Sequence, residues 1–231
     1  INKCNFLPFN RIKVRLKNEI VSMGKIGLQI KNHKALKVAP KDWNNLIKNK
    51  NYKTIDVRNN YEIDIGKFSN ALNPKTNSFR EFPKKLEALK IKKNDKLAIY
   101  CTGGIRCEKA AAYLQEEGFK NIYLLDGGIL NYLNFHKNKK NSKWLGECFV
   151  FDNRVTVDKH LHKGSYDQCH GCRHPITTGD KKLKSFKKGI SCKYCFNKRT
   201  KTQLQKSEMR QKQIELYKKM GVDHPFKKVS V

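Results

Sequence analysis

The sequence predicts an α/β fold built on a mostly parallel sheet. Three short apolar segments are each followed by a segment of helical composition, with turn residues between them. The strand candidates are TIDVR (54–58), KLAIY (96–100) and NIYLLDGG (121–128). Strands that alternate with helices of this length favour a parallel sheet, because the chain must cross over between neighbouring strands.

The helical segments are recognised by their apolar spacing, by the glycines that follow some of them and, for the last one, by helix propensity. We expect helices over DWNNLIKNK (42–50), FPKKLEALKI (82–91), CEKAAAYLQEEG (107–118), ILNYLNFHKN (129–138) and KTQLQKSEMRQKQIELYKKMG (201–221). Asp42 lies near the start of the first, and Gly118 and Gly221 are expected to end the third and the last.

Three other segments are assigned from their patterning. Apolar and charged residues alternate in FNRIKVRLKNEIV (9–21), which predicts a half-buried strand ending near Gly24. NNYEIDIGKFSNALNP (59–74) is polar and contains Gly66 and Pro74, so it predicts a loop. FDNRVTVDKH (151–160) fits a strand or an extended linker.

Charge points to a polyanionic partner. The formal net charge is +30, and residues 181–231 carry +13 of it. Such a field attracts nucleic acid, although a merely solvated tail is the alternative.

The chain contains no apolar run long enough to span a membrane and shows no secretory signal pattern at its start, so we expect a soluble, cytoplasmic protein. Its eight cysteines are then more readily reactive or metal-binding thiols than disulfides.

The loop CTGGIR (101–106) is the strongest candidate for a reactive site. It joins the strand at 96–100 to the helix that follows, and ligands bind beyond the carboxyl ends of parallel strands. Cys101 heads the loop, the helix N-terminus favours an anion, and Arg106 adds a positive charge. Loop support is assigned to the residues between them, Thr102, Gly103, Gly104 and Ile105. The two glycines permit backbone N–H groups to turn toward one point, which suits a thiolate or a persulfide; a buried structural cysteine is the alternative.

Three further residues belong to this candidate site. Asp56 and Arg58 follow the strand at 54–58 and are expected at the same edge of the sheet as Cys101. Cys107 lies in the first helical turn, where it is either a packing residue or a second, resolving thiol.

Four cysteines near the C-terminus have the spacing of a metal site. They are Cys169, Cys172, Cys192 and Cys195, which form two C-x-x-C pairs. Four thiolates predict a closed, structural zinc site, with a lost metal or a redox dithiol pair as alternatives. His170 and His174 lie inside this segment but are expected to contact solvent.

Aromatic residues alternate with lysines in the same segment. Phe186, Tyr194 and Phe196 are suited to stacking on unpaired RNA bases, or they cover the small metal core. We favour the second interpretation for Phe196.

These motifs together resemble a family, the rhodanese-domain tRNA uridine(34) hydroxylases. The resemblance covers the chain from about Phe9 to Cys195. It is carried by EIVSMG, DVRNNYEIDIGKFSNALNP, FREFP, YCTGGIRCEKAAAYL, LDGGILNY and CHGCRHPIT with the later CKYC.

The resemblance implies three parts of the chain. Residues 1–30 are expected to be the tail of an N-terminal ferredoxin-like (acylphosphatase-like) domain, residues 40–140 a rhodanese domain, and residues 150–231 a cysteine-rich basic region with a zinc-ribbon-like segment.

The resemblance also implies an activity, the oxygen-dependent 5-hydroxylation of the wobble uridine in the tRNA anticodon loop. Cys101 matches the nucleophile and persulfide-forming position, and Arg106 is expected to close the active loop. Asp56 is expected to orient backbone groups, and Arg58 to pair with a carboxylate such as Glu62, in roles that are structural or catalytic.

Two other functions remain open at this stage. The loop also suits a sulfurtransferase that acts through a Cys101 persulfide, and the charge suits a non-catalytic RNA-binding module. We find no flavin, dinucleotide or haem motif and no evident set of iron ligands. No cofactor for the oxidation is therefore evident, and molecular oxygen as co-substrate is implied by the resemblance alone.

Overall fold

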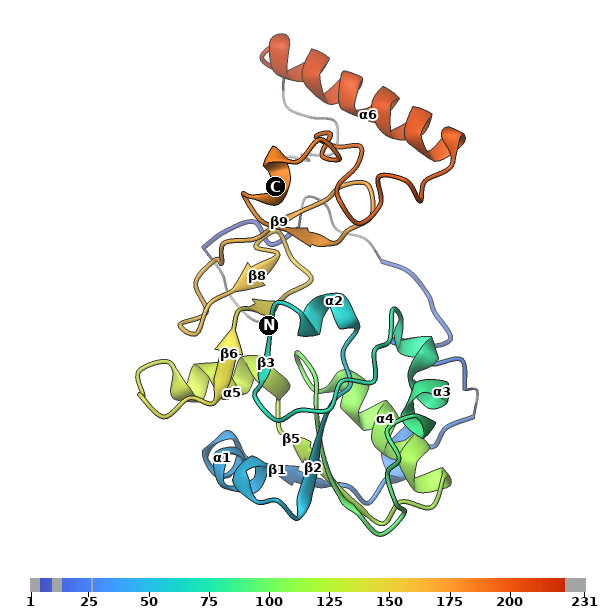
Figure 1. The fold of residues 1–231 in the computed structure, drawn as a ribbon, viewed down its shortest axis with the longest axis vertical. Helices are drawn as coiled ribbons and strands as arrows, with labels where there is room; N and C mark the ends of the chain where they lie inside the picture. Colours follow the sequence, from blue (N-terminus) through green and yellow to red (C-terminus); the bar gives the residue numbers. More distant parts are fainter. Residues whose placement is uncertain (1–4, 10–13, 26, 223–231) are drawn as a thin grey trace. The chain divides into compact units, whose positions relative to one another are not determined.

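The computed structural model describes residues 5–9, 14–25 and 27–222. They fall into two compact units (Figure 1). The sheet unit consists of Lys17–Phe149 and Val157–His162, and the cysteine unit consists of the described residues within Ile1–Leu16, Val150–Thr156 and Lys163–Val231. None of the described helices is both long and apolar enough to cross a membrane.

The sheet unit contains a four-stranded parallel sheet in the order β1-β5-β4-β2. The strands are β1 (Leu36–Val38), β2 (Tyr52–Asp56), β4 (Lys96–Tyr100) and β5 (Asn121–Leu125). The predicted α/β class and all three predicted strands are confirmed. The sequence pattern did not reveal β1, because a strand of three residues is too short to show alternation.

Helices lie on both faces of this sheet, with α1 and α5 on one side and α3 and α4 on the other (Figure 1). They are α1 (Pro40–Lys48), α3 (Phe82–Glu87), α4 (Ile105–Glu116) and α5 (Gly128–His136). The sheet unit also contains two short 3-10 helices, η1 (Ile30–Asn32) and η2 (Phe79–Glu81). Helix α3 is shorter than predicted, because Lys90 adopts a left-handed φ of 50° soon after it.

The loop predicted over residues 59–74 is wrong in part. It contains a helical turn, α2 (Asn60–Ile63), and a short strand, β3 (Gly66–Phe68). Asn59 and Glu62 form a capping box that starts the turn. β3 pairs antiparallel with β6 (Trp144–Gly146), where a side chain on Gly66 would meet the carbonyl of Glu147 at 2.3 Å. This pairing partner lies far along the chain, so the local sequence could not indicate it.

The strand predicted near the start is wrong for the residues that the structure describes there. Ile12 lies outside them, and residues 14–25 contain no strand. Val14 and Leu16 are exposed, since an alternating pattern forms a strand only beside a partner. Further along, the side chain of Lys109 on α4 donates to the carbonyl of Val21 at 3.0 Å, and Met23 is buried in the core.

Two apolar groups surround the sheet. Between the sheet and helices α3 and α4, the core is aliphatic, with Ile55, Leu97, Ile99 and Leu124 against Ala110 and Ala111 among others. The other group is aromatic and centres on Phe68. The rings of Trp43, Tyr100, Tyr132 and Trp144 lie with centroids 4.8–6.1 Å from it. Both faces of the parallel sheet are therefore covered.

The cysteine unit has little regular structure apart from one long helix. β9 (Asp167–Gln168) pairs antiparallel with β10 (Pro175–Ile176), and η3 (Asp180–Lys182) follows. The helix α6 (Lys201–Lys219) begins at a Thr200–Gln203 capping box and ends before Gly221, as predicted.

Residues 151–160, predicted as a strand or an extended linker, contain only one regular element, the short strand β8 (Thr156–Val157). The strand β7 (Cys148–Phe149), which belongs to the sheet unit, precedes this segment.

Candidate functional site

The candidate active loop lies at the carboxyl edge of the parallel sheet. β2 ends at Asp56 and β4 ends at Tyr100, and these two residues are partners in the strand register. Cys101 follows directly, so Asp56 and Cys101 emerge side by side at this edge, as the sequence predicts. From there the chain turns through residues 102–104 into α4.

The Cys101 thiol is fully buried and faces backbone donors. The N–H of Gly104 donates to Sγ at 3.1 Å. Gly104 has a φ of 94° and is the N-cap of α4, so it uses the freedom that glycine alone has without strain. Gly103 is exposed and does not adopt a positive φ. Only one of the two glycines is therefore needed for the backbone turn.

The surroundings of Cys101 favour the thiolate. Burial raises the pKa of the thiol, but the hydrogen bond with Cys107, the charge of Arg106 and the N–H groups of both residues outweigh it. Together they lower this pKa to about 6. At neutral pH the sulfur is therefore mainly ionised and ready to act as a nucleophile.

Cys107 has the opposite character. It is buried in the aliphatic core, and burial together with the neighbouring Cys101 thiolate raises its pKa well above the ordinary value. It therefore stays protonated and stabilises the Cys101 thiolate through their hydrogen bond. This role combines the predicted packing position with a donor function that the sequence did not reveal.

Arg106 is held by Glu62. Its two terminal nitrogens donate to the two carboxylate oxygens at 2.7 Å each, and one of them also donates to the Thr102 hydroxyl at 3.2 Å. Glu62 is completely buried on α2 and also accepts from the N–H of Asn59. A paired, buried arginine of this kind fixes the first turn of α4 against α2.

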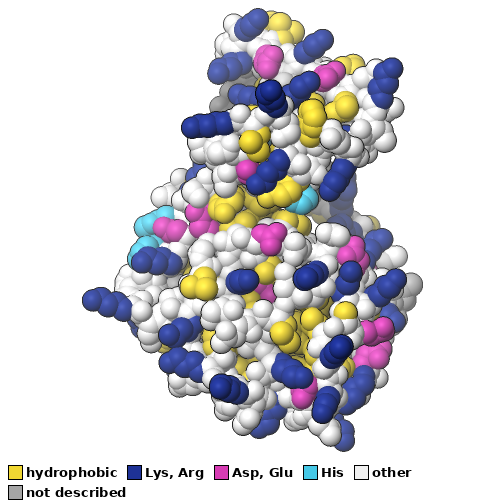
Figure 2. Space-filling view, in the orientation of Figure 1, with side chains coloured by type: hydrophobic (Ala, Val, Ile, Leu, Met, Phe, Trp, Pro, Cys, Tyr) yellow, Lys and Arg dark blue, Asp and Glu magenta, His cyan; other side chains and the backbone are white. Residues whose placement is uncertain are grey.

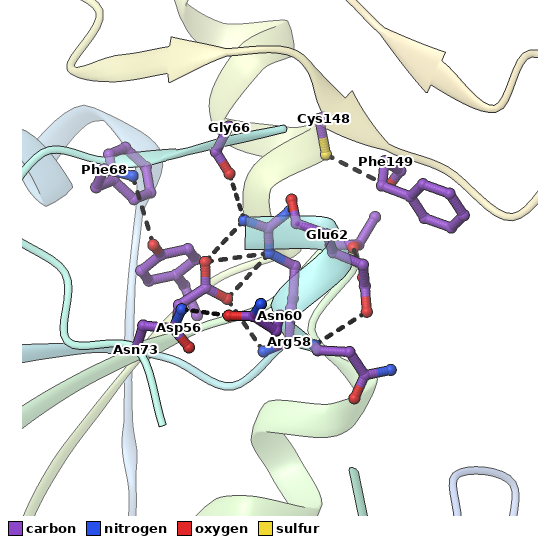
Figure 3. Close-up of polar contacts among 12 residues, drawn as sticks. Asp56, Arg58, Asn60, Glu62, Gly66, Phe68, Asn73, Cys148 and Phe149 are labelled. Carbon is purple, nitrogen blue, oxygen red and sulfur yellow. Dashed lines mark hydrogen bonds and ion pairs between the residues drawn. The ribbon is translucent and has the colours of Figure 1, made fainter. Parts of the chain in front are cut away.

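Arg58 pairs with a carboxylate as expected, but the partner is Asp56 and not Glu62, the example that we named. Arg58 donates from Nε and Nη2 to the carboxylate of Asp56, at 2.7–3.2 Å, and neither side chain is exposed (Figure 3). Its other contacts are with the backbone carbonyls of Glu62 and Gly66. Asp56 is two residues away on the same strand end, and Glu62 is already occupied by Arg106.

This pairing gives Asp56 and Arg58 a supporting position. Asp56 also accepts a hydrogen bond from the backbone N–H of Arg58 at 3.0 Å. The Arg58 guanidinium also lies 5.1 Å from the Trp144 ring, so the pair ties β2 to α2, β3 and β6. Neither residue touches the Cys101 sulfur in any contact found among the described residues.

The start of α5 holds the active loop through backbone hydrogen bonds and a close approach at Gly128. The sequence did not lead us to assign these residues to the site. The N–H of Ile129 donates to the carbonyl of Cys101 at 2.9 Å, and that of Leu130 to Thr102 at 3.1 Å. Gly128 has a φ of 66°, and a Cβ there would lie 2.5 Å from the Cys101 carbonyl oxygen. In the sequence, the Asp-Gly-Gly turn after β5 was the feature that could have indicated this close approach.

A cavity of about 270 Å³ opens beside the loop. Gly103, Gly104 and Ile105 form one side, and the ends of β1 and β5 form the other. Lys37 and Glu108 line it as an ion pair with a 3.3 Å separation, and Ile105 is 47% exposed. The cavity therefore lies beside the loop, and Cys107 lines it, whereas the fully buried Cys101 does not.

The cysteine cluster is assembled in the cysteine unit. The sulfurs of Cys169, Cys172, Cys192 and Cys195 all lie within 4.8 Å of one another, and none of the four is in a disulfide. Three of them are buried and Cys172 is half-buried. Four such sulfurs can hold a metal ion. His170 is exposed and His174 stacks on Tyr194, so neither belongs to the cluster.

The aromatic residue that packs on the cysteine cluster is not the one that we expected. Phe186 packs against the cysteines, whereas Phe196 is 42% exposed. The expectation that Phe196 covers the core is therefore wrong, because Phe186 occupies that place. Tyr194 is 39% exposed with Lys193 beside its ring.

Comparison with known proteins gives one domain match and several relatives. Residues 39–134 match the rhodanese-like domain family. A rhodanese-like domain protein from Staphylococcus aureus is 25% identical over 42% of this chain and 90% of its own, with a TM-score of 0.36. A polysulfide-sulfur transferase from Wolinella succinogenes is 25% identical over 49% of this chain and 89% of its own, with a TM-score of 0.39.

A much longer match is found with a protein of Pelagibacter ubique (strain HTCC1062), which is a tRNA uridine(34) hydroxylase. The identity is 49% over 228 residues, which is 99% of this chain and 74% of that relative. The match extends through both units and includes the active loop and the cysteine cluster. With a rhodanese-like sheet, a thiolate-holding loop and this full-length similarity, the chain belongs to the tRNA uridine(34) hydroxylase family.

Proposed function

We propose that this protein hydroxylates C5 of uridine 34 in the anticodon loop of tRNA, with Cys101 as the reacting thiolate. The observation that carries the proposal is the buried Cys101 sulfur, which accepts the N–H of Gly104 at the carboxyl edge of the sheet, in a chain whose hydroxylase relative matches it over 99% of its length. The lowered pKa of this thiol is consistent with that geometry. Enzymes that modify a single base take it out of its stack, and the cavity beside the loop offers a place for one base.

The residues of the loop have distinct parts in this proposal. Cys101 reacts as a nucleophile or carries a persulfide. Gly104 and Cys107 stabilise its charge by hydrogen bonding, and Arg106 adds a permanent positive charge while Glu62 holds it in place. Asp56 and Arg58 are positioning residues that fix α2 against the strand end. Hydroxylation replaces the C5–H bond of uridine with a C5–OH group, and molecular oxygen is the proposed co-substrate. One of its oxygen atoms enters the base and the other leaves as water, with two electrons and two protons supplied by an external two-electron reductant.

Since the proposed substrate is tRNA, we propose that the protein acts in the cytoplasm.

The proposed function is tested by mass spectrometry of tRNA nucleosides from a deletion strain complemented with the wild type, Cys101→Ser or Cys148→Ala. Cys148 is also buried but lies outside the active loop, so it is a matched control. We expect 5-hydroxyuridine derivatives to disappear with Cys101→Ser and to persist with Cys148→Ala. Full complementation by Cys101→Ser contradicts the proposal.

A sulfurtransferase is the alternative that the same loop supports, because a site that stabilises a thiolate also stabilises a persulfide. The same spectra separate the two functions. Loss of a thiolated nucleoside, with hydroxylated uridine unchanged, assigns sulfur transfer to Cys101.

We further propose that the cysteine cluster binds structural zinc. A tetrahedral site with Zn–S bonds of about 2.3 Å separates neighbouring sulfurs by about 3.8 Å. The sulfur pairs Cys172–Cys192, Cys169–Cys195 and Cys192–Cys195 are 3.7, 4.0 and 4.0 Å apart. Disulfides would bring bonded sulfurs to about 2.05 Å. Elemental analysis of anaerobically purified protein should find about one zinc per chain, and less than a tenth of an equivalent refutes the assignment.

A further inference from the structure

The segment from η3 through the second pair of cysteines to the residues before α6 carries a concentration of positive charge. Residues 181–199 contain eight lysines and arginines and no aspartate or glutamate. We call residues 181–188 the basic loop. Its five lysines are all exposed, and they are Lys181, Lys182, Lys184, Lys187 and Lys188. Figure 2 shows how Lys and Arg side chains outnumber Asp and Glu on the visible face of the protein.

Most of these charges have no acidic partner among the described residues. Lys181 pairs with Asp167, and nearby Lys193 pairs with Asp180 at 2.8 Å. For the remaining four lysines of the loop, no carboxylate of the described chain lies within ion-pair distance. Adjacent positive charges without counterions repel one another, so a polyanion that bridges them relieves an existing cost.

The backbone under these lysines is held firmly. Lys187 and Ser191 exchange two backbone hydrogen bonds at 2.9 and 3.1 Å, and the Ser191 hydroxyl donates to the carbonyl of Ser185 at 2.9 Å. The ring of Phe186 packs on the cysteine cluster. The lysines are therefore carried on a preformed turn rather than on a free tail, and binding need not order the backbone.

Helix α6 fastens the same turn from the other side. Arg210 donates to the carbonyls of His170 and Gly189, at 3.2 and 2.7 Å. Arg199, just before the helix, donates to the carbonyl of Ile190 at 2.6 Å. The inner face of α6 buries Ser207 and Gln211 instead of large apolar residues. These hydrogen bonds reach His170, between the first two cysteines, and Gly189 and Ile190, directly after the basic loop. The helix therefore holds the backbone that joins the basic loop to the cysteine cluster.

We propose that the basic loop is a phosphate-binding surface for tRNA, kept in shape by the cysteine cluster. This inference rests on the proposed function, because tRNA is the polyanion that the hydroxylase must hold. The four unpaired lysines supply the charge, and the exposed ring of Phe196 follows on the same segment, where an unpaired base can stack. Phosphate contacts of this kind provide affinity and position rather than sequence recognition.

The test compares two variants of the full chain with equal net charge. In the loop variant, Lys182, Lys184, Lys187 and Lys188 are changed to glutamine. The matched control changes four exposed lysines of the sheet unit in the same way, and these are Lys48, Lys50, Lys84 and Lys85. Affinity for fluorescently labelled tRNA is measured by anisotropy at several salt concentrations, without any reaction taking place.

We expect the loop variant to bind tRNA about 10- to 100-fold more weakly at low salt. Its plot of log affinity against log salt should be shallower by about 0.7–0.9 for each phosphate that the loop no longer neutralises, about 3 in all. The control should stay within about 3-fold of wild type. Equal decreases in the affinity of the two variants mean that only overall charge matters and overturn the inference, as does unchanged binding by the loop variant.

Two further measurements separate the possible failures. Unchanged zinc content and circular dichroism of the loop variant exclude misfolding as the cause of weak binding. A wild-type protein that does not bind tRNA at all contradicts the proposed function itself. Wild-type protein that binds and hydroxylates tRNA, together with a loop variant that binds equally well, contradicts only the inference about the loop.

Discussion

The chemistry of the site depends on how a few polar atoms surround one sulfur. Cys101 is buried, which by itself would keep it neutral, yet the thiol of Cys107, the charge of Arg106 and their N–H groups lower its pKa and favour the thiolate. The two cysteines in this loop therefore differ in charge because one accepts the hydrogen bond that the other donates.

Alkylation of Cys101 should follow a pKa of about 6 rather than the value of about 8.5 for a free cysteine. The rate of iodoacetamide labelling, followed for the Cys101 peptide by mass spectrometry, should reach half its maximum near pH 6. Cys107→Ala removes a donor and should move this midpoint upward, while Cys107→Ser keeps a hydroxyl donor and should restore much of the shift. A wild-type midpoint near pH 8.5 contradicts the assignment.

Glu62 and Arg106 form a buried pair, and breaking it leaves an uncompensated charge. Glu62→Gln should therefore destabilise the protein by about 3–5 kcal/mol in urea unfolding. Glu108→Gln is the control, because its ion pair with Lys37 is roughly half exposed and contributes only about 0–1 kcal/mol. Similar decreases in the stability of the two variants would show that Arg106 finds another partner.

At the scale of elements, the active loop is shaped by the start of two helices. Gly104, the N-cap of α4, donates its N–H to the sulfur, while the start of α5 donates two N–H groups to the carbonyls of Cys101 and Thr102. The short α2 contributes Glu62 from a capping box. Each of these ends is fixed by one backbone conformation or one cap rather than by extensive packing.

Gly128→Ala should disturb the loop through α5. The new Cβ would lie 2.5 Å from the Cys101 carbonyl oxygen and 2.7 Å from that of Thr102, at a φ of 66°. We expect the unfolding free energy to fall by about 3 kcal/mol, and Cys101-dependent activity to be abolished. Gly118→Ala is the control: its φ is 87°, but no heavy atom lies within 4 Å, so strain alone should cost about 1 kcal/mol. Equal costs at the two positions would contradict the close approach at Gly128.

At the scale of the whole molecule, the two units are stabilised in different ways. The sheet unit buries an aliphatic core and an aromatic cluster, whereas the core of the cysteine unit consists mainly of its four cysteines with Ile176 and Phe186. A region with so few apolar side chains is expected to gain folding free energy from the proposed zinc.

Removal of metal should therefore loosen one unit and leave the other intact. After chelation under reducing conditions, hydrogen exchange should accelerate across residues 167–219, including α6, and stay slow in β2, β4 and β5. Cys172→Ser should reproduce this pattern without a chelator, and Cys148→Ala, which removes a cysteine outside the cluster, should not. Uniform acceleration in both units would show that they unfold together.

The α/β class, the three central strands, the active loop and the spacing of the four cysteines could all be predicted from the amino-acid order. These features are local: apolar runs, glycines, caps and the C-x-x-C repeats are visible within a few residues. The folded structure was needed to find that Arg58 pairs with Asp56, that Arg106 pairs with Glu62, and that β3 pairs with β6 about 80 residues away. Partner choice among several nearby charges depends on which side chains the fold has already buried together, and no local pattern contains that information. The same reason applies to Cys101, whose ionised state follows from groups that the folded loop gathers around one atom.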